Sequence, residues 1–103
     1  PPFDLLAEML TLRVHLDSVN IDNAPLLIAP GSHRMGRVVE PDIKNVVKNC
    51  GTFTCLSKAG DVWLYATPIL HGSEPVRTQS SRRVLQVDYS ARDLPLPLQW
   101  LGI

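Results

Sequence analysis

The sequence has few cysteines and no long hydrophobic run. Cys50 and Cys55 are the only cysteines in 103 residues, too few for the disulfide framework of a small secreted domain, and one Cys-x4-Cys pair is weak evidence for zinc. We therefore expect two thiols in a cytoplasmic protein, with a disulfide across a hairpin as the alternative. No apolar stretch is long enough to span a bilayer, and no signal-peptide layout is present.

An excess of charge of one sign is also lacking. Ten basic and ten acidic residues give a formal net charge of zero, so no overall field attracts nucleic acid or a membrane surface. Hydrophobic residues make up 45% of the chain, which is enough for a folded core. This length corresponds to one domain at most, here residues 1–103. The chain does not begin with methionine, which we interpret as a processed or partial chain.

Alternation of apolar and polar residues predicts a strand at residues 11–17. Its aliphatic residues share one face and its polar residues share the other: Leu12, Val14 and Leu16 against Thr11, Arg13, His15 and Asp17. Further strands are predicted at 26–29, 52–56, 62–65, 69–70 and 82–89, with a helix at 42–48 and a helical turn capped by Asp4. Many short strands with little helix indicate a mainly β sandwich or barrel.

Turn and breaker residues divide these segments. Gly60-Asp61 predicts a tight bend, and Pro68 marks a bulge or a sheet edge. The Pro- and Leu-rich residues 90–103 cannot continue a sheet, because proline lacks the N–H that a ladder needs. We expect them to form a tail that packs over the surface through Trp100 and its leucines.

Two residues near the end of the chain could bind a ligand. His71 stands at a predicted strand end before Gly72-Ser73, and Arg82 enters the next strand-like run. A neutral imidazole can bind a metal, and a guanidinium can hold a carboxylate through two hydrogen bonds. From the residues alone, a histidine hydrogen-bonded within a turn and a solvated basic pair of Arg82 with Arg83 are the simpler interpretations.

Five short motifs, in a fixed order, favour ligand-binding roles for His71 and Arg82. They are Asp22-Asn-Ala-Pro-Leu26, Pro30-Gly-Ser-His-Arg34, Gly60-Asp61 before a strand, His71-Gly-Ser73 and then Arg82. This series resembles the phytanoyl-CoA dioxygenase-like family over residues 10–89. The resemblance implies a double-stranded β-helix (a jelly-roll or cupin-like barrel) and an oxygenase (hydroxylase) that uses Fe(II) and 2-oxoglutarate on a small-molecule substrate.

The resemblance also assigns roles to His71 and Arg82. His71 matches the distal iron ligand of the family, and Arg82 matches the arginine that binds the distal carboxylate of 2-oxoglutarate. Adjacent residues in a strand point to opposite faces, so we predict Arg82 inside the barrel and Arg83 outside.

His15-Leu16-Asp17 has the letters of the His-x-Asp pair that the family uses to bind iron, and with His71 it would complete two histidines and one carboxylate. However, this segment leads directly into the Asn-Ala-Pro-Leu motif, which in the family follows a later strand. We therefore expect His15 and Asp17 to line the cavity, with iron ligation as the alternative. Arg13 shares their face and would pair with Asp17 or receive an anionic substrate.

Other conspicuous residues are given structural roles. We expect His33 to bond backbone groups and fix the Pro-Gly-Ser-His turn. Trp63 and Tyr65 share a strand face and, like Cys55, are assigned to packing.

The family's iron-binding His-x-Asp strand is expected before Pro1, which would leave this chain an incomplete barrel that binds iron weakly. The strand from Thr11 would then lack a neighbour, and unpaired strand edges recruit other chains. Two functions remain open: a fragment of an oxygenase that is inactive alone, or a metal-free β-barrel module that acts by binding or by forming a homo-oligomer.

Overall fold

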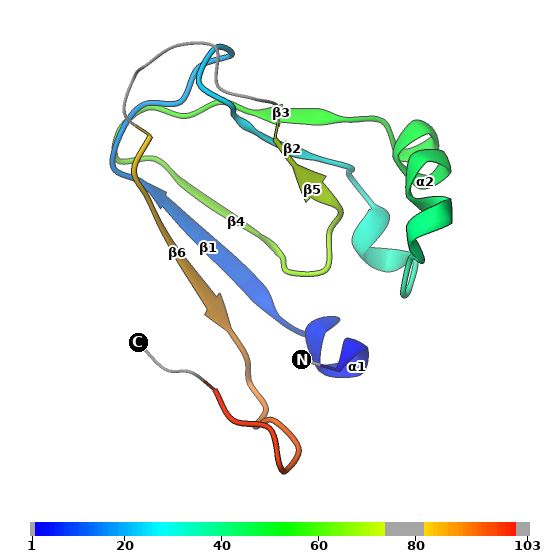
Figure 1. Ribbon diagram of the computed structural model, residues 1–103. Helices are drawn as coiled ribbons and strands as arrows, with labels where there is room; N and C mark the ends of the chain where they lie inside the picture. The colour runs from blue at the N-terminus through cyan, green and yellow to red at the C-terminus, as the bar shows by residue number, and fades with distance from the viewer. Residues whose placement is uncertain (1, 74–81, 101–103) are drawn as a thin grey trace.

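The computed structural model describes residues 2–73 and 82–100, and its regular structure is dominated by two three-stranded antiparallel sheets (Figure 1). The first has the order β4-β1-β6 and consists of β1 (Leu10–His15), β4 (Val62–Ala66) and β6 (Val84–Tyr89). The second has the order β3-β2-β5 and consists of β2 (Leu26–Ile28), β3 (Phe53–Cys55) and β5 (His71–Gly72). The predicted mainly β architecture is confirmed.

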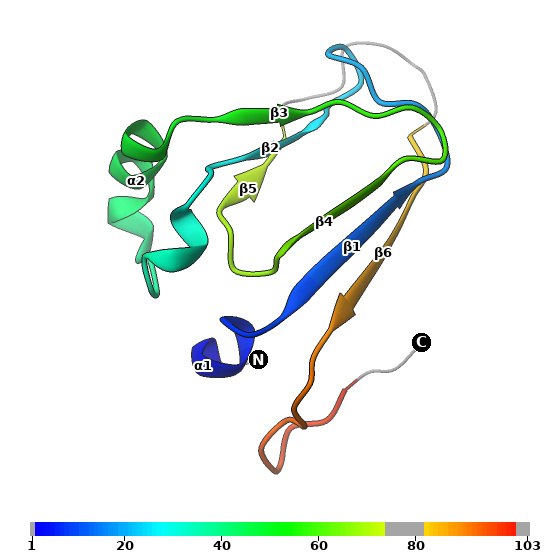
Figure 2. The ribbon, with the colours of Figure 1, turned by 180° about the vertical axis from the view of Figure 1, so that it is seen from behind.

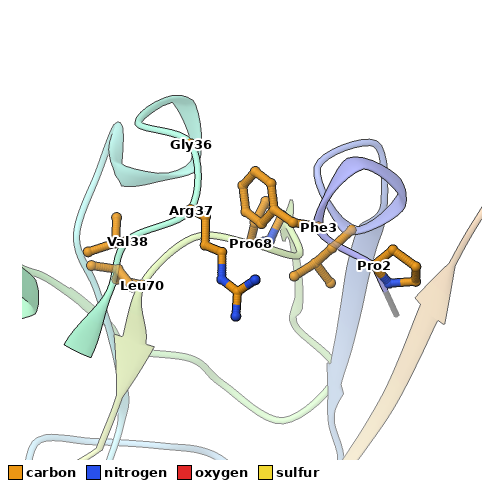
Figure 3. A pocket seen from close by; sticks show the side chains of 8 residues that line it. Pro2, Phe3, Gly36, Arg37, Val38, Pro68 and Leu70 are labelled. Carbon is orange, nitrogen blue, oxygen red and sulfur yellow. The ribbon is translucent and has the colours of Figure 1, made fainter.

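Helical structure is short and lies at one side of the sheets, as the two opposite views show (Figures 1 and 2). It comprises α1 (Phe3–Leu6), the 3-10 turns η1 (Ser32–Arg34) and η2 (Glu40–Asp42), and α2 (Ile43–Cys50). The predicted helix at 42–48 is confirmed within two residues. Asp4 does not cap α1, because the N-cap position is Pro2 and no side chain bonds there. No helix among the described residues has the length and apolar character needed to cross a membrane.

Strand β1 is the centre of its sheet. It pairs with β4 from Leu10↔Ala66 to Val14↔Val62 and with β6 from Leu10↔Tyr89 to His15↔Val84. The expectation that this strand lacks a neighbour was wrong, because both of its edges are hydrogen-bonded. The exposed ladder edges belong instead to the outer strands of each sheet, β4, β6, β3 and β5.

The inner face of β1 is polar and its outer face is apolar. Thr11 and His15 are each only 2% exposed. The aliphatic and aromatic residues of the opposite phase face solvent at 46–60% exposure: Leu10, Leu16, Val62, Leu64, Leu85 and Tyr89. Alternation thus predicted which residues of β1 share a face. The face that β1 buries is the polar face. The buried apolar residues lie mainly in α1, the second sheet and the connecting segments: Leu5, Met9, Val19, Ala24, Leu26, Ala29, Val46, Cys55 and Ile69.

The segment before His71 is a turn and not the predicted strand. The Ile69 N–H donates to the Ala66 carbonyl at 3.1 Å, which closes a tight turn through Pro68. Pro68 fixes its own φ and offers no N–H to a ladder, so the chain reverses here and β5 begins only at His71. The Gly60-Asp61 bend is confirmed: Gly60 has a φ of 92°, and the Asp61 carboxylate accepts the Lys58 N–H at 2.8 Å.

The C-terminal segment is held by charge more than by its leucines. Arg92 forms ion pairs with Asp4 at 3.2 Å and Glu8 at 3.4 Å on the α1 side. Leu96 is 90% exposed, because a turn closed by the Leu98 N–H to the Pro95 carbonyl directs it outward. The expectation that the tail leucines cover the surface was therefore wrong for Leu96. Both cysteines are free thiols, Cys55 buried and Cys50 half-buried.

Candidate functional site

Aromatic rings from both sheets meet in the space between them. The rings of Tyr65 and His71 lie 6.1 Å apart between centroids, and those of Phe53 and Trp63 lie 6.0 Å apart. Each pair joins a residue of β4 to one of the second sheet. Trp63 also donates its Nε1–H to the Ser57 hydroxyl at 3.1 Å. Trp63 and Tyr65 thus occupy the predicted shared face, half-buried.

His71 is held in one ring orientation by a backbone contact. Its Nδ1 lies 2.8 Å from the carbonyl oxygen of Ile69, and a carbonyl only accepts, so Nδ1 carries the proton. Nε2 then has the lone pair, which is the tautomer that a metal requires. His71 is exposed and opposite Ile28 in the ladder. The structure therefore presents a potential ligand nitrogen beside Tyr65.

The turn that precedes His71 is fixed by Ser32. The Ser32 hydroxyl accepts the Leu70 N–H at 2.8 Å, and the Ala29 N–H donates to the Leu70 carbonyl at 2.9 Å. Ser32 is 1% exposed. His33 was expected to bond backbone groups and fix the Pro-Gly-Ser-His turn, but its buried Nδ1 has no hydrogen-bond partner among the described residues. That turn is closed by backbone bonds, from the Ser32 N–H to the Ala29 carbonyl and from the Arg34 N–H to the Gly31 carbonyl, each at 3.1 Å.

Arg82 and Arg83 have different partners. Arg83 binds Asp17 with its Nε–H at 3.0 Å, a second guanidinium N–H at 3.0 Å and its backbone N–H at 2.7 Å. Its side chain is 71% exposed. Arg82 lies two residues before Val84, whose partner in the ladder is His15, and its guanidinium donates to the Ala24 carbonyl. Arg82 is itself exposed in the structure.

The expected pairing of Arg13 with Asp17 was wrong, because Arg83 takes that carboxylate. The hydrogen bonds from Arg83 hold the pKa of Asp17 below its ordinary value. Arg13 instead donates to the Gln86 side chain at 3.2 Å. It also lies beside Tyr65, whose pKa is raised because burial outweighs the hydrogen bond from Arg13.

Sequence reasoning missed a hydrogen-bonded group at the far end of β1. The Thr11 hydroxyl donates to Asp88 at 2.7 Å and lies 2.9 Å from the Thr67 hydroxyl. Only the register of β1 with β6 brings Thr11 and Asp88 together, and a single sequence contains no signal for it.

The complete donor set for a metal is not found among residues 2–73 and 82–100. No three His, Cys, Asp or Glu side chains in that part of the chain come together as a metal site. His15, Asp17 and His71 are therefore not assembled as a triad. A pocket of about 310 Å³ borders His71 and is lined otherwise by uncharged residues: Leu27, Ile28, Ala29, Ile43, Val47, Thr52, Leu70, Gly72 and Ser73.

The arrangement of two antiparallel sheets with ligand-type residues between them is that of a double-stranded β-helix protein. The model of the family "Phytanoyl-CoA dioxygenase (PhyH)" matches residues 2–84. The chain belongs to this family.

Solved structures agree with this assignment. The apo form of EctD from S. alaskensis is similar, with 28% sequence identity and a TM-score of 0.77, over 88% of this chain and 35% of that one. EctD solved with 2-oxoglutarate and 5-hydroxyectoine has 29% sequence identity and a TM-score of 0.73, over 81% of this chain and 31% of that one. EvdMO1 is similar with 25% sequence identity and a TM-score of 0.72, over 81% of this chain and 20% of that one. This confirms the predicted double-stranded β-helix, as a partial domain that spans about a third of EctD. A search of curated proteins found no significant match.

Proposed function

We propose that this chain is the part of an Fe(II)- and 2-oxoglutarate-dependent oxygenase that supplies one iron ligand, His71, and the cosubstrate arginine, Arg82. The observation that carries the proposal is the contact between Nδ1 of His71 and the Ile69 carbonyl, which leaves Nε2 as the metal-binding nitrogen. EctD, a structural relative, has been solved with bound Fe and with 2-oxoglutarate.

The role of Arg82 rests on its position and chemistry. Arg82 precedes β6 by two residues, on the phase of Val84, the ladder partner of His15. A guanidinium suits a carboxylate because it can donate two parallel hydrogen bonds. Its contact with the Ala24 carbonyl engages one of five N–H donors. This contact joins the Arg82 side chain to Ala24, two residues before β2.

The residues described here do not form a complete iron site. Iron in such enzymes is held by two histidines and a carboxylate, and only the imidazole of His71 is suitably placed. When bound, iron would activate O2, the oxidant for hydroxylation, and 2-oxoglutarate would supply two of the four electrons that O2 accepts. What this chain contributes is a fixed imidazole, a guanidinium and the walls of the cavity. We expect no turnover from residues 1–103 alone.

Metal titration tests the assignment of His71. Mn(II) is titrated into the chain with 2-oxoglutarate present, for the unmodified protein, His71→Ala and the control His33→Ala. Weak binding that His71→Ala abolishes and His33→Ala leaves unchanged is the expected result. Binding that is indifferent to His71 contradicts the proposal, and a tight one-to-one site lost in His15→Ala would instead assign the His15-Asp17 pair to the metal.

A second candidate function is a metal-free module that acts by self-association. It is favoured by the exposed apolar face of the β4-β1-β6 sheet, where Leu64 is 60% and Leu85 is 54% exposed. Contiguous apolar surface of this kind is typical of contact with another protein segment. The two candidates differ in their dependence on His71, which this face does not include.

A further inference from the structure

His15 is a buried imidazole without a hydrogen-bond partner. The residue is 2% exposed, and neither Nδ1 nor Nε2 has a partner among residues 2–73 and 82–100. Buried polar atoms are nearly always paired, because an unpaired buried donor or acceptor costs stability. Such a group in the interior of a binding fold therefore indicates a ligand that completes it.

The groups around His15 are predominantly cationic. Arg13 stands two residues earlier on the same face of β1, and its Nε also has no partner among the described residues. Val84 is the ladder partner of His15, which places Arg82 on the adjoining diagonal, within reach of a long side chain. Burial, followed by the charge of Arg13 and then of Arg82, lowers the pKa of His15.

One acid offsets this charge in part. Asp61 raises the pKa of His15, with an effect that ranks between those of Arg13 and Arg82, and its carboxylate accepts the Lys58 N–H in an exposed turn. A neutral imidazole next to two guanidiniums suits an anion that accepts from all three. A carboxylate meets this requirement, because it has two oxygens with about four acceptor positions.

We propose that His15 is a carboxylate-binding residue, which donates a ring N–H to the distal carboxylate of the five-carbon dicarboxylic acid held by Arg82. The proposal rests on the proposed function in taking Arg82 as the cosubstrate arginine. It adds a second, directly contacting donor from the central strand of the sheet. Arg13, tethered to Gln86 by its NH1 group, lies next along the same strand face.

Glutarate without metal is the probe that isolates this contact, because it has the distal carboxylate but no keto group to chelate iron. Its affinity is measured by calorimetry for the unmodified chain, His15→Leu, His15→Gln and the control His33→Leu. We expect His15→Leu to weaken glutarate about tenfold or more, as for a lost hydrogen bond to a charged group. His15→Gln keeps an amide donor and should retain most of the affinity, and His33→Leu should match the unmodified chain.

A measurement on the unmodified chain covers the case in which His15→Leu does not fold. The ¹⁵N resonances of the His15 ring are followed as glutarate is added, with butyrate as the single-carboxylate reference. A shift of one ring nitrogen toward a hydrogen-bonded donor supports the proposal. Unmoved ring nitrogens, no glutarate binding by the unmodified chain, or unchanged affinity in a folded His15→Leu would each overturn it. Since no metal is present, this result is independent of the His71 titration.

Discussion

The Ser32 hydroxyl oxygen lies 2.8 Å from the Leu70 backbone nitrogen, although 38 residues separate them in the sequence. This contact joins the Pro-Gly-Ser-His turn to the segment that ends in His71. The orientation of the proposed metal-binding nitrogen thus depends on a motif far from it in the chain.

Replacement of Ser32 by alanine should destabilise the fold by about 1–3 kcal/mol, the usual cost of a buried donor left unsatisfied. Chemical unfolding measures the loss. Ser18→Ala is the matched control, because its exposed hydroxyl also accepts a backbone N–H, from Ala59 at 3.0 Å. Water can replace that bond, so Ser18→Ala should cost less than about 0.5 kcal/mol. Equal losses in the two variants would contradict the structural role of Ser32.

Ala24 has a φ of +56°, a conformation in which an L side chain is strained and glycine is not. Ala24→Gly should therefore stabilise the protein by about 0.5–1 kcal/mol, despite the greater freedom of glycine in the unfolded chain. The control is Ala7→Gly, at a φ of −63°. Because alanine adopts this φ without strain, the control should lose about 0.5–1 kcal/mol of stability. A destabilised Ala24→Gly variant would contradict the backbone strain assigned to Ala24.

The ion pair of Asp17 with Arg83 should make stability depend on pH in acid. Because the folded-state pKa of Asp17 is lowered by Arg83, its contribution is present above the ordinary carboxyl pKa of 3.8 and is lost as the pH falls through the lowered value. Asp17→Asn should be less stable than the unmodified chain at pH 7, and the difference should vanish in strong acid. The exposed Asp22→Asn serves as the control, and urea unfolding across this range provides the measurement.

We expect the isolated chain to self-associate through the apolar face of the β4-β1-β6 sheet. Leu64→Lys places a charge on this face and should shift the equilibrium toward monomer in sedimentation experiments over a dilution series. Leu56→Lys is the control, because Leu56 is similarly exposed at 51% and lies outside that sheet. A monodisperse monomer of the unmodified chain at high micromolar concentration would contradict the prediction.

Alternation and turn chemistry predicted the elements well, because both depend on neighbouring residues. The strand around His15 and the bend at Gly60-Asp61 are examples. Partner choice was not predictable, since it depends on groups that meet only in the fold. Asp17 pairs with Arg83 and not with Arg13, which shares its strand, because β6 brings Arg83 to the end of β1.

Which face of a strand is buried was equally hidden from the sequence. Leucines alternating with polar residues normally indicate an aliphatic interior, yet β1 buries Thr11 and His15. A few convergent polar groups among apolar and aromatic side chains are typical of a cavity that binds a ligand. His71 and Arg82 were found through the family motifs, whereas the unpartnered state of His15 required the structure.

The position of β1 between β4 and β6 determines when the first sheet can form during synthesis. β1 leaves the ribosome before β4 and β6, but Thr11 is hydrogen-bonded to Thr67, 56 residues later, and to Asp88, 77 residues later. The sheet therefore cannot close until nearly all of these residues have been translated. Contacts of such long sequence separation also slow folding, because loop closure precedes any gain from pairing. The nascent chain thus has a prolonged interval with an unpaired, leucine-bearing strand, a state in which chaperone binding would be most effective.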